Sequence, residues 1–152
     1  MADLEGGITR DGTAYHGRML NILGQRYFPK ASCETTFSFE TNSEAGQFVP
    51  VHVHPHQDEF ILVQEGELHL KLDGVWSVAK AGDLVRMPKG VPHGYFNKSD
   101  KPARALFWVD ERAVPPDDPE SNYGLARRML IDPLQPRAPR AFPMPAAQLD
   151  LE

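Results

Sequence analysis

Short runs in which apolar and polar residues alternate fill the middle of the chain. In Glu67–Leu72 every second residue is a leucine, which is the period of a strand with one buried face. Asp73-Gly74 follows directly and favours a two-residue hairpin turn, because both of its positions require a positive φ. The same kind of pattern predicts further strands over 17–23, 33–39, 48–54, 60–63, 75–79, 83–87, 93–97 and 103–109. Many short strands separated by turn residues indicate an all-β sandwich or closed barrel.

The chain divides into three zones within one predicted domain. Residues 1–32 are expected to form an N-terminal strand and arm, 33–110 the barrel, and 111–152 a Pro-rich C-terminal extension. Eight of the 14 prolines lie from Pro115 to Pro145, and those at 136, 139, 143 and 145 exclude regular strand pairing in the last part of the chain. A short helix is predicted over 121–131. Beyond it, an extended arm packed on its own or a neighbouring barrel and a partly ordered tail are both open.

Composition narrows the classes of partner and compartment. The single cysteine, Cys33, permits no intramolecular disulfide, as is usual in a reducing cytosol. The net charge of −5 and the lack of a basic cluster disfavour nucleic acid as a partner. No apolar run reaches membrane-spanning length and the N-terminus lacks a signal-peptide pattern, so we expect a cytoplasmic protein without a membrane partner.

Four side chains are candidate metal ligands: His52, His54, Glu59 and His93. His52 and His54 are two apart on a predicted strand and should leave the same face. Glu59 follows a predicted turn, and His93 follows a second turn much later in the chain. Imidazole and carboxylate groups bind divalent Fe, Mn, Ni, Co, Cu or Zn. Three imidazoles and one carboxylate leave open coordination positions, as a catalytic site requires.

The spacing around these residues resembles the two signature motifs of the cupin superfamily. The first block runs from Gly46 through the two histidines and Glu59 to Gly66, and the second from Gly82 through Pro88, Gly90 and His93 to Asn97. The resemblance implies a jelly-roll (double-stranded β-helix) barrel over roughly residues 33–110. It also implies one divalent metal ion on His52, His54, Glu59 and His93. The first block is similar to single-domain cupins of the quercetin dioxygenase-like kind.

Several neighbours of the predicted site are candidates for its lining. Tyr95 lies two residues after His93 and should share its inward face, where it either assists catalysis by hydrogen bonding or fills the core. Ile61 and Val63 share the face of Glu59. His56 is expected at the rim, outside the ligand set. Further candidates for the apolar wall are Phe37, Phe39, Phe48, Phe107 and Trp108.

The leading hypothesis is a metal-dependent dioxygenase that acts on a small aromatic or enolisable substrate. In it Glu59 is both a ligand and the group that accepts the enol proton. One alternative is a non-redox metal-dependent isomerase, lyase or polyketide cyclase, and another is a small-molecule-binding module without catalysis. A homodimer is expected, because symmetric pairing commonly covers the faces and edges of small β-barrels.

Overall fold

The computed structural model describes residues 5–22, 24–33 and 35–110. Within these ranges it is all-β, as predicted, and its one helical element is a short 3₁₀ turn. No helix in the described part of the chain is long and apolar enough to cross a membrane. The elements are η1 (Tyr15–Gly17), β1 (Leu20–Ile22), β2 (Gln25–Ser32), β3 (Thr36–Ser43), β4 (Phe48–His52), β5 (Glu59–Glu65), β6 (Glu67–Leu72), β7 (Val75–Lys80), β8 (Leu84–Met87), β9 (His93–Phe96) and β10 (Ala103–Asp110).

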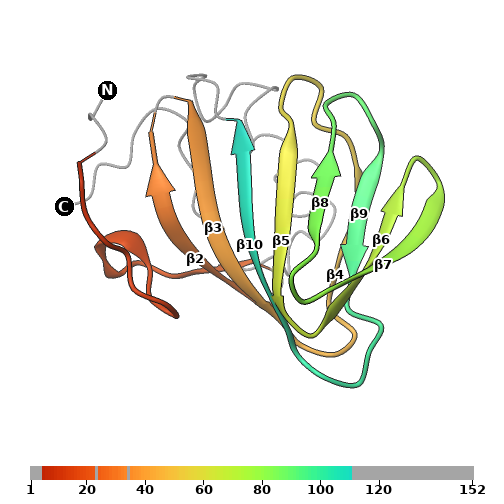
Figure 1. The fold of residues 1–152 in the computed structure, drawn as a ribbon, viewed down its shortest axis with the longest axis horizontal. Coiled ribbons are helices and arrows are strands. Elements are labelled where there is room, and N and C mark those ends of the chain that lie inside the picture. Colours follow the sequence, from red (N-terminus) through yellow and green to blue (C-terminus); the bar gives the residue numbers. More distant parts are fainter. Residues whose placement is uncertain (1–4, 23, 34, 111–152) are drawn as a thin grey trace, which may run out of the picture.

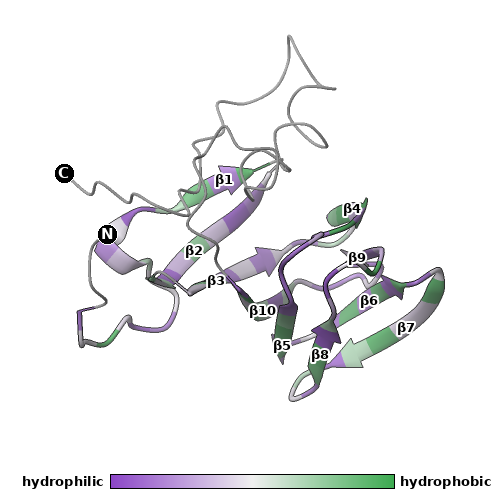
Figure 2. Cartoon of the chain, turned by 90° about the horizontal axis from the view of Figure 1, so that it is seen from above, coloured by the Kyte–Doolittle hydropathy of each residue, from purple (hydrophilic) through white to green (hydrophobic). Residues whose placement is uncertain are grey.

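The strands form two antiparallel sheets. The larger has the order β1-β2-β3-β10-β5-β8 and the smaller has the order β4-β9-β6-β7 (Figure 1). Strands that are consecutive in the chain often lie in different sheets, so the connections after β3, β4, β5, β7, β8 and β9 cross between the sheets. Seen from above, the smaller sheet lies along one side of the larger one (Figure 2).

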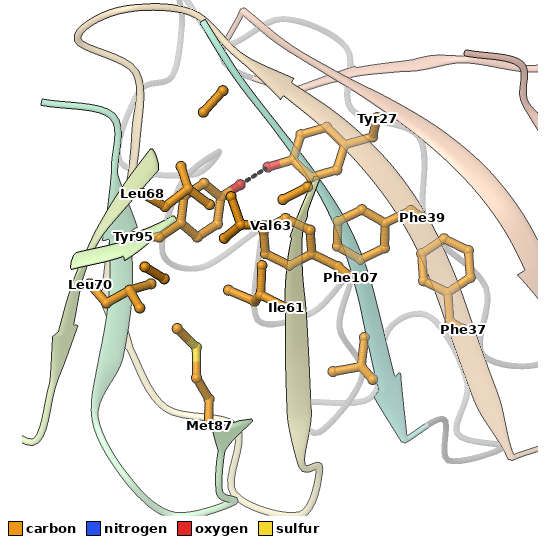
Figure 3. Packing of buried hydrophobic residues seen from close by; sticks show 14 residues of the cluster. Tyr27, Phe37, Phe39, Ile61, Val63, Leu68, Leu70, Met87, Tyr95 and Phe107 are labelled. Atoms are coloured by element: carbon orange, nitrogen blue, oxygen red, sulfur yellow. Dashed lines mark hydrogen bonds between the residues drawn. The ribbon is translucent and has the colours of Figure 1, made fainter. Parts of the chain in front are cut away.

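The core fills the space between the inner faces of the two sheets. Aromatic rings from the larger sheet dominate one side, and the Phe39 and Phe107 rings stack with centroids 5.0 Å apart (Figure 3). Ile61 and Val63 are fully buried beside them, as predicted. Burying each such side chain contributes roughly 1.5–3 kcal/mol, so this aromatic and aliphatic layer is the main source of stability.

The prediction for the apolar wall was correct for three of its five candidates. Phe37, Phe39 and Phe107 are buried. Phe48 instead lies on the outer side of the smaller sheet, 51% exposed and stacked on Phe96. Trp108 alternates with the buried Phe107 and stacks on Phe60, so it lies on the outer side of the larger sheet. Alternation assigns these residues to a face, but the sequence did not show which face was inside.

The predicted hairpin at Asp73-Gly74 is confirmed, with φ of 46° and 79° at its two positions. Other strand boundaries differ from those predicted. The first strand is shorter, Leu20–Ile22, because η1 precedes it, and the strand predicted from residue 33 begins at Thr36. Strand β2 was not predicted. Its alternation is interrupted at Pro29, where the pairing with β3 shifts register. The predicted helix over 121–131 and the Pro-rich extension lie outside the described residues.

Gly66 connects β5 to β6 at a point where the chain is closely packed. Its φ is +72°, and a β-carbon there would lie 2.7 Å from the Pro102 carbonyl oxygen. Gly74 has a similar φ of +79°, but nothing lies within 4 Å of its added β-carbon. The two glycines therefore share the same backbone requirement and differ in the space around them.

Replacing Gly66 with alanine should lower the free energy of unfolding by about 3 kcal/mol, against about 1–2 kcal/mol for Gly74→Ala. Both variants force alanine into a left-handed conformation, but only Gly66→Ala also forces the backbone apart. Urea unfolding followed by circular dichroism measures both values. Equal losses in the two variants would show that the close approach at Gly66 has no energetic consequence.

Candidate metal centre

The four predicted ligands come together at one end of the barrel. His52 is the last residue of β4, Glu59 the first of β5 and His93 the first of β9. His54 follows β4 in the loop that leads to Glu59. One potential ligand atom from each of the four lies within 4.8 Å of the others. The group combines residues up to 41 positions apart in the chain, from His52 to His93.

The route by which His54 reaches the cluster differs from the predicted one. The strand prediction extended to His54, but β4 ends at His52, where its pairing with β9 is irregular. His54 is nevertheless buried, and the bond from the Gly90 N–H to its carbonyl oxygen (2.8 Å) holds its backbone. His56 is exposed and lies outside the cluster, as predicted.

Backbone hydrogen bonds fix the loop 53–58 against its neighbours. The Lys89 N–H donates to the Asp58 carboxylate at 2.8 Å, and the Asp110 N–H donates to the Asp58 carbonyl at 3.1 Å. With the bond from Gly90, three contacts tie the first ligand loop to the turn before His93 and to the end of β10. These hydrogen bonds within the fold help to position the ligands, which is the preorganisation that a functional site needs.

Gly94 allows β4 and β9 to approach each other beside the cluster. A β-carbon at this position would lie 2.9 Å from the Val49 carbonyl oxygen and 3.0 Å from the Val51 nitrogen. Such distances require the backbone of β4 to move. His52 and His93 are direct partners across this pair of strands, so a shift of β4 would separate two of the four ligands.

Backbone carbonyl groups determine which ring nitrogen of His52 and of His93 carries a hydrogen. Nδ1 of His52 lies 2.9 Å from the Pro50 carbonyl, and Nδ1 of His93 lies 2.8 Å from the Val91 carbonyl. A carbonyl can only accept, so each Nδ1 carries a hydrogen, and Nε2 is the ring nitrogen left to bind a metal. Burial lowers the pKa of His52 to about 4, with the charge of His54 as a further cause, so this ring is neutral near pH 7.

The cluster contains more nitrogen and oxygen atoms with free lone pairs than the hydrogen-bond donors of the described residues can satisfy. Nε2 of His54 lies 3.0 Å from Oε2 of Glu59 and 3.2 Å from Nε2 of His52. Nε2 of His93 is fully buried without a hydrogen-bond partner among the described residues, since Glu59 Oε2 is 3.7 Å away. Burial by itself raises the pKa of Glu59, but the His54 and His93 imidazoles lower it below its usual range.

Converging imidazole nitrogens and an ionised carboxylate fit a divalent cation. Three nitrogens and one oxygen make up the donor set that d-block metals such as Fe, Mn, Ni, Co, Cu and Zn accept. The hydrogen bonds from His52 and His93 to backbone carbonyls also orient the rings, as is usual for metal-binding histidines. The four residues could therefore hold one metal ion.

Tyr95 faces the interior, as predicted, but its hydroxyl bonds to two residues on a strand that was not predicted. It donates to Gln25 Oε1 at 3.0 Å and lies 3.4 Å from the Tyr27 hydroxyl. Gln25 in turn donates to the Phe48 carbonyl, which links the two sheets. Burial raises the pKa of Tyr27 to about 12 and that of Tyr95 well above its usual value. Both phenols are therefore protonated at neutral pH and act as hydrogen-bonding groups.

Comparison with known families agrees with the two motifs. The family model described as Cupin domain matches residues 39–109. Residues 39–109 are a cupin domain. The described fold is similar to that of an RmlC-like cupin from Shewanella frigidimarina, with a TM-score of 0.62 and 20% identity, over 72% of this chain and 94% of that chain. At this identity the likeness shows the fold alone.

Curated relatives match only part of their length. Quercetin 2,3-dioxygenase of Bacillus subtilis is 41% identical over 56 residues, which are 37% of this chain and 17% of the relative. Polyketide synthase CurC of Streptomyces cyaneus is 32% identical over 71 residues, 47% of this chain and 46% of the relative. The chain thus spans about half the length of these curated relatives or less. The shared region agrees with the cupin domain. It does not show that this chain has the activity of either relative.

Addition of a divalent metal to the metal-free protein should raise its melting temperature. At a free metal concentration 100 times the Kd, the gain is about 2.7 kcal/mol, or roughly 5–10 °C for a chain of this size. The gain should be lost in His93→Ala and kept in His56→Ala, since His56 lies outside the cluster. Differential scanning fluorimetry measures it. A gain that survives in His93→Ala would place the metal elsewhere.

Proposed function

We propose that this chain is a metal-dependent dioxygenase that acts on a small, uncharged aromatic or enolisable substrate. The observation that carries the proposal is the combination of the metal-ligand cluster with an interior wall of aromatic rings. The strands that carry Glu59 and His93 also direct Ile61, Val63 and Tyr95 inward. A flat apolar molecule that presents an oxygen to the metal fits such an environment.

The charges of the interior support an uncharged substrate. Among the described residues, the buried acidic side chains are Glu40 and Glu59, and no lysine or arginine is buried. Glu40 pairs with Lys30 at 3.3 Å and lies near Arg104. A phosphate or carboxylate group in the barrel would thus find no basic partner among the buried described residues, apart from the metal. This disfavours substrates such as sugar phosphates.

His52, His54, Glu59 and His93 would hold the metal, and their arrangement leaves coordination positions for substrate. A bound divalent metal would act as a Lewis acid that lowers the pKa of an enol or phenol oxygen. Glu59 is proposed to accept the proton of that oxygen. Both atoms of O₂ enter the products and the substrate supplies all the electrons, so the reaction needs no external reductant.

The catalytic role expected of the Tyr95 hydroxyl stays a prediction. Its hydrogen is donated to Gln25, so in the described arrangement it is an anchor of the polar network between the sheets. We propose that it shapes the interior wall beside His93, through its ring contact with Phe107 at 5.0 Å. A direct contact with substrate stays a prediction.

The second candidate is a non-redox metal-dependent enzyme, such as a cyclase, isomerase or lyase. The similarity to Polyketide synthase CurC favours it, because the match covers 71 residues against 56 for the quercetin dioxygenase. The same cluster would serve, since Lewis-acid chemistry requires no change in metal oxidation state. A binding module without turnover is a third candidate. The homodimer also stays a prediction.

Oxygen consumption decides among these candidates. Protein reconstituted with Fe(II), and in parallel with Mn(II), Ni(II), Co(II) and Cu(II), is supplied with flavonols, β-diketones and catechols in an oxygen-electrode cell. We expect oxygen uptake equal to substrate loss with at least one compound, at least 100-fold lower in His54→Ala and unchanged in His56→Ala. Turnover under strict anaerobiosis would instead establish the non-redox enzyme, and binding without turnover would establish the binding module.

A further inference from the structure

Strand β7 is an edge of the smaller sheet, with no strand beyond it among the described residues (Figure 2). Its six residues pair with β6 in one unbroken register. Three large apolar side chains of this strand are exposed, Val75 at 69%, Val78 at 48% and Trp76 at 46%. Its one charged residue, Lys80, lies at its end. An exposed apolar edge of this kind readily pairs with another strand, which proteins usually prevent with charges, prolines or bulges.

The other described sheet edges have features that prevent such pairing. β1 has only three residues, and β8 has four, with Arg86 among them. β4 contains Pro50, and its register with β9 is irregular. Among the described edges, β7 is therefore the longest, and it is free of proline and least protected by charge.

The hairpin turn determines which backbone groups of β7 face this edge. Leu72 and Val75 flank a two-residue turn and so form a hydrogen-bonded pair, from which alternate residues of β7 bond to β6 and the others face outward. Lys80 is one of the outward residues. Its N–H donates to the Asp83 carboxylate and its carbonyl accepts from the Asp83 N–H, both at 2.8 Å.

Trp76 and Val78 face outward in the same way, so each directs one N–H and one C=O to the edge. These groups have no hydrogen-bond partner in the part of the chain that the structure describes. The Trp76 ring lies over the sheet toward β9, with its centroid 4.9 Å from that of Phe96 and 3.3 Å from the Lys98 Nζ. The edge thus offers free donors and acceptors beside exposed apolar side chains.

We propose that β7 of a second copy of this chain pairs with this edge in antiparallel orientation, about a two-fold axis at Ser77. In this register Trp76 lies opposite Val78 of the second copy, and each free N–H and C=O of both copies is used. Moving the axis by one residue either way leaves groups unpaired, since the Lys80 groups are already bonded and Gly74 lies in the turn. The two four-stranded sheets then join into one continuous sheet.

Charges are complementary in the same register. Lys80 of one copy lies opposite Gly74 of the other, beside its Asp73, and both charged residues are exposed. The chain carries a net charge of −5, so unselective contacts between copies are repulsive, whereas this pairing places opposite charges together. An edge of one strand is a small interface, so the dimer should be weak, with a Kd of roughly 10–100 µM. No candidate metal ligand lies on β7, so this inference is independent of the proposed function.

Sedimentation velocity of the full-length protein over about 5–500 µM measures the association. We expect the mass to rise from that of one 17.0 kDa chain toward twice that value. In Val78→Pro the Kd should rise about 30-fold, because proline removes the N–H that faces the second copy but breaks no bond to β6. Val78→Ala keeps that N–H and should raise the Kd by no more than about fivefold.

Single cysteines test the register. Ser77→Cys, in a Cys33→Ser background, places two thiols opposite each other at the axis, with Cα atoms about 4.5 Å apart and within disulfide range. Mild oxidation with glutathione disulfide should cross-link this variant into a dimer on a non-reducing gel. Val75→Cys in the same background is the matched control. It lies on the same strand and face but opposite Ala79 of the second copy, so it should stay uncross-linked.

The mass of one chain at every concentration, with no cross-link in Ser77→Cys, would overturn the inference. A dimer that is unaffected by Val78→Pro and cross-links equally through positions 75 and 77 would place the interface elsewhere and overturn it as well. If circular dichroism shows that Val78→Pro does not fold, the two cysteine variants decide, because neither removes a backbone N–H. Metal content and oxygen uptake test the proposed function separately.

Discussion

The candidate site depends on the close approach of strands β4 and β9. His52 and His93 are partners across this pair, and Gly94 leaves room for the β4 backbone where a β-carbon would lie 2.9 Å from the Val49 carbonyl oxygen. Because the two strands lie so close, ligands from two distant parts of the chain meet. The bond from Gly90 to His54 adds the third histidine to the same unit.

This arrangement holds several electron-pair donors together in a buried space. The Nε2 atoms of His52 and His54 are 3.2 Å apart, and that of His93 has no partner among the described residues. Without a cation, burial of such groups costs stability. Backbone pairing and the aromatic core offset that cost. The barrel can therefore keep a site that favours metal binding at some expense of stability.

Alternation and turn chemistry predicted most of the strands, because Leu68, Leu70 and Leu72 follow the period of two and Asp73-Gly74 suits only a tight hairpin. The motif spacing, read through the cupin resemblance, identified the four residues that the fold brings together. The strand that carries Gln25 and Tyr27 was missed, because Pro29 interrupts its pattern. The partners of Tyr95 were missed with it.

Other features could not be read from the sequence because they depend on tertiary contacts. Phe48 and Phe39 look alike in an alternating strand, yet one is exposed and the other buried. The need for glycine at position 94 arises from a neighbouring strand that is distant in sequence.

The central claim, that this barrel holds one divalent metal on His52, His54, Glu59 and His93, is tested most directly by elemental analysis of the untagged protein. Purification must avoid an immobilised-metal column, since carried-over nickel would occupy the same ligands. The account predicts close to one d-block metal ion per chain, removed by chelation and restored by titration. Protein that contains no metal and takes none up on titration would contradict it.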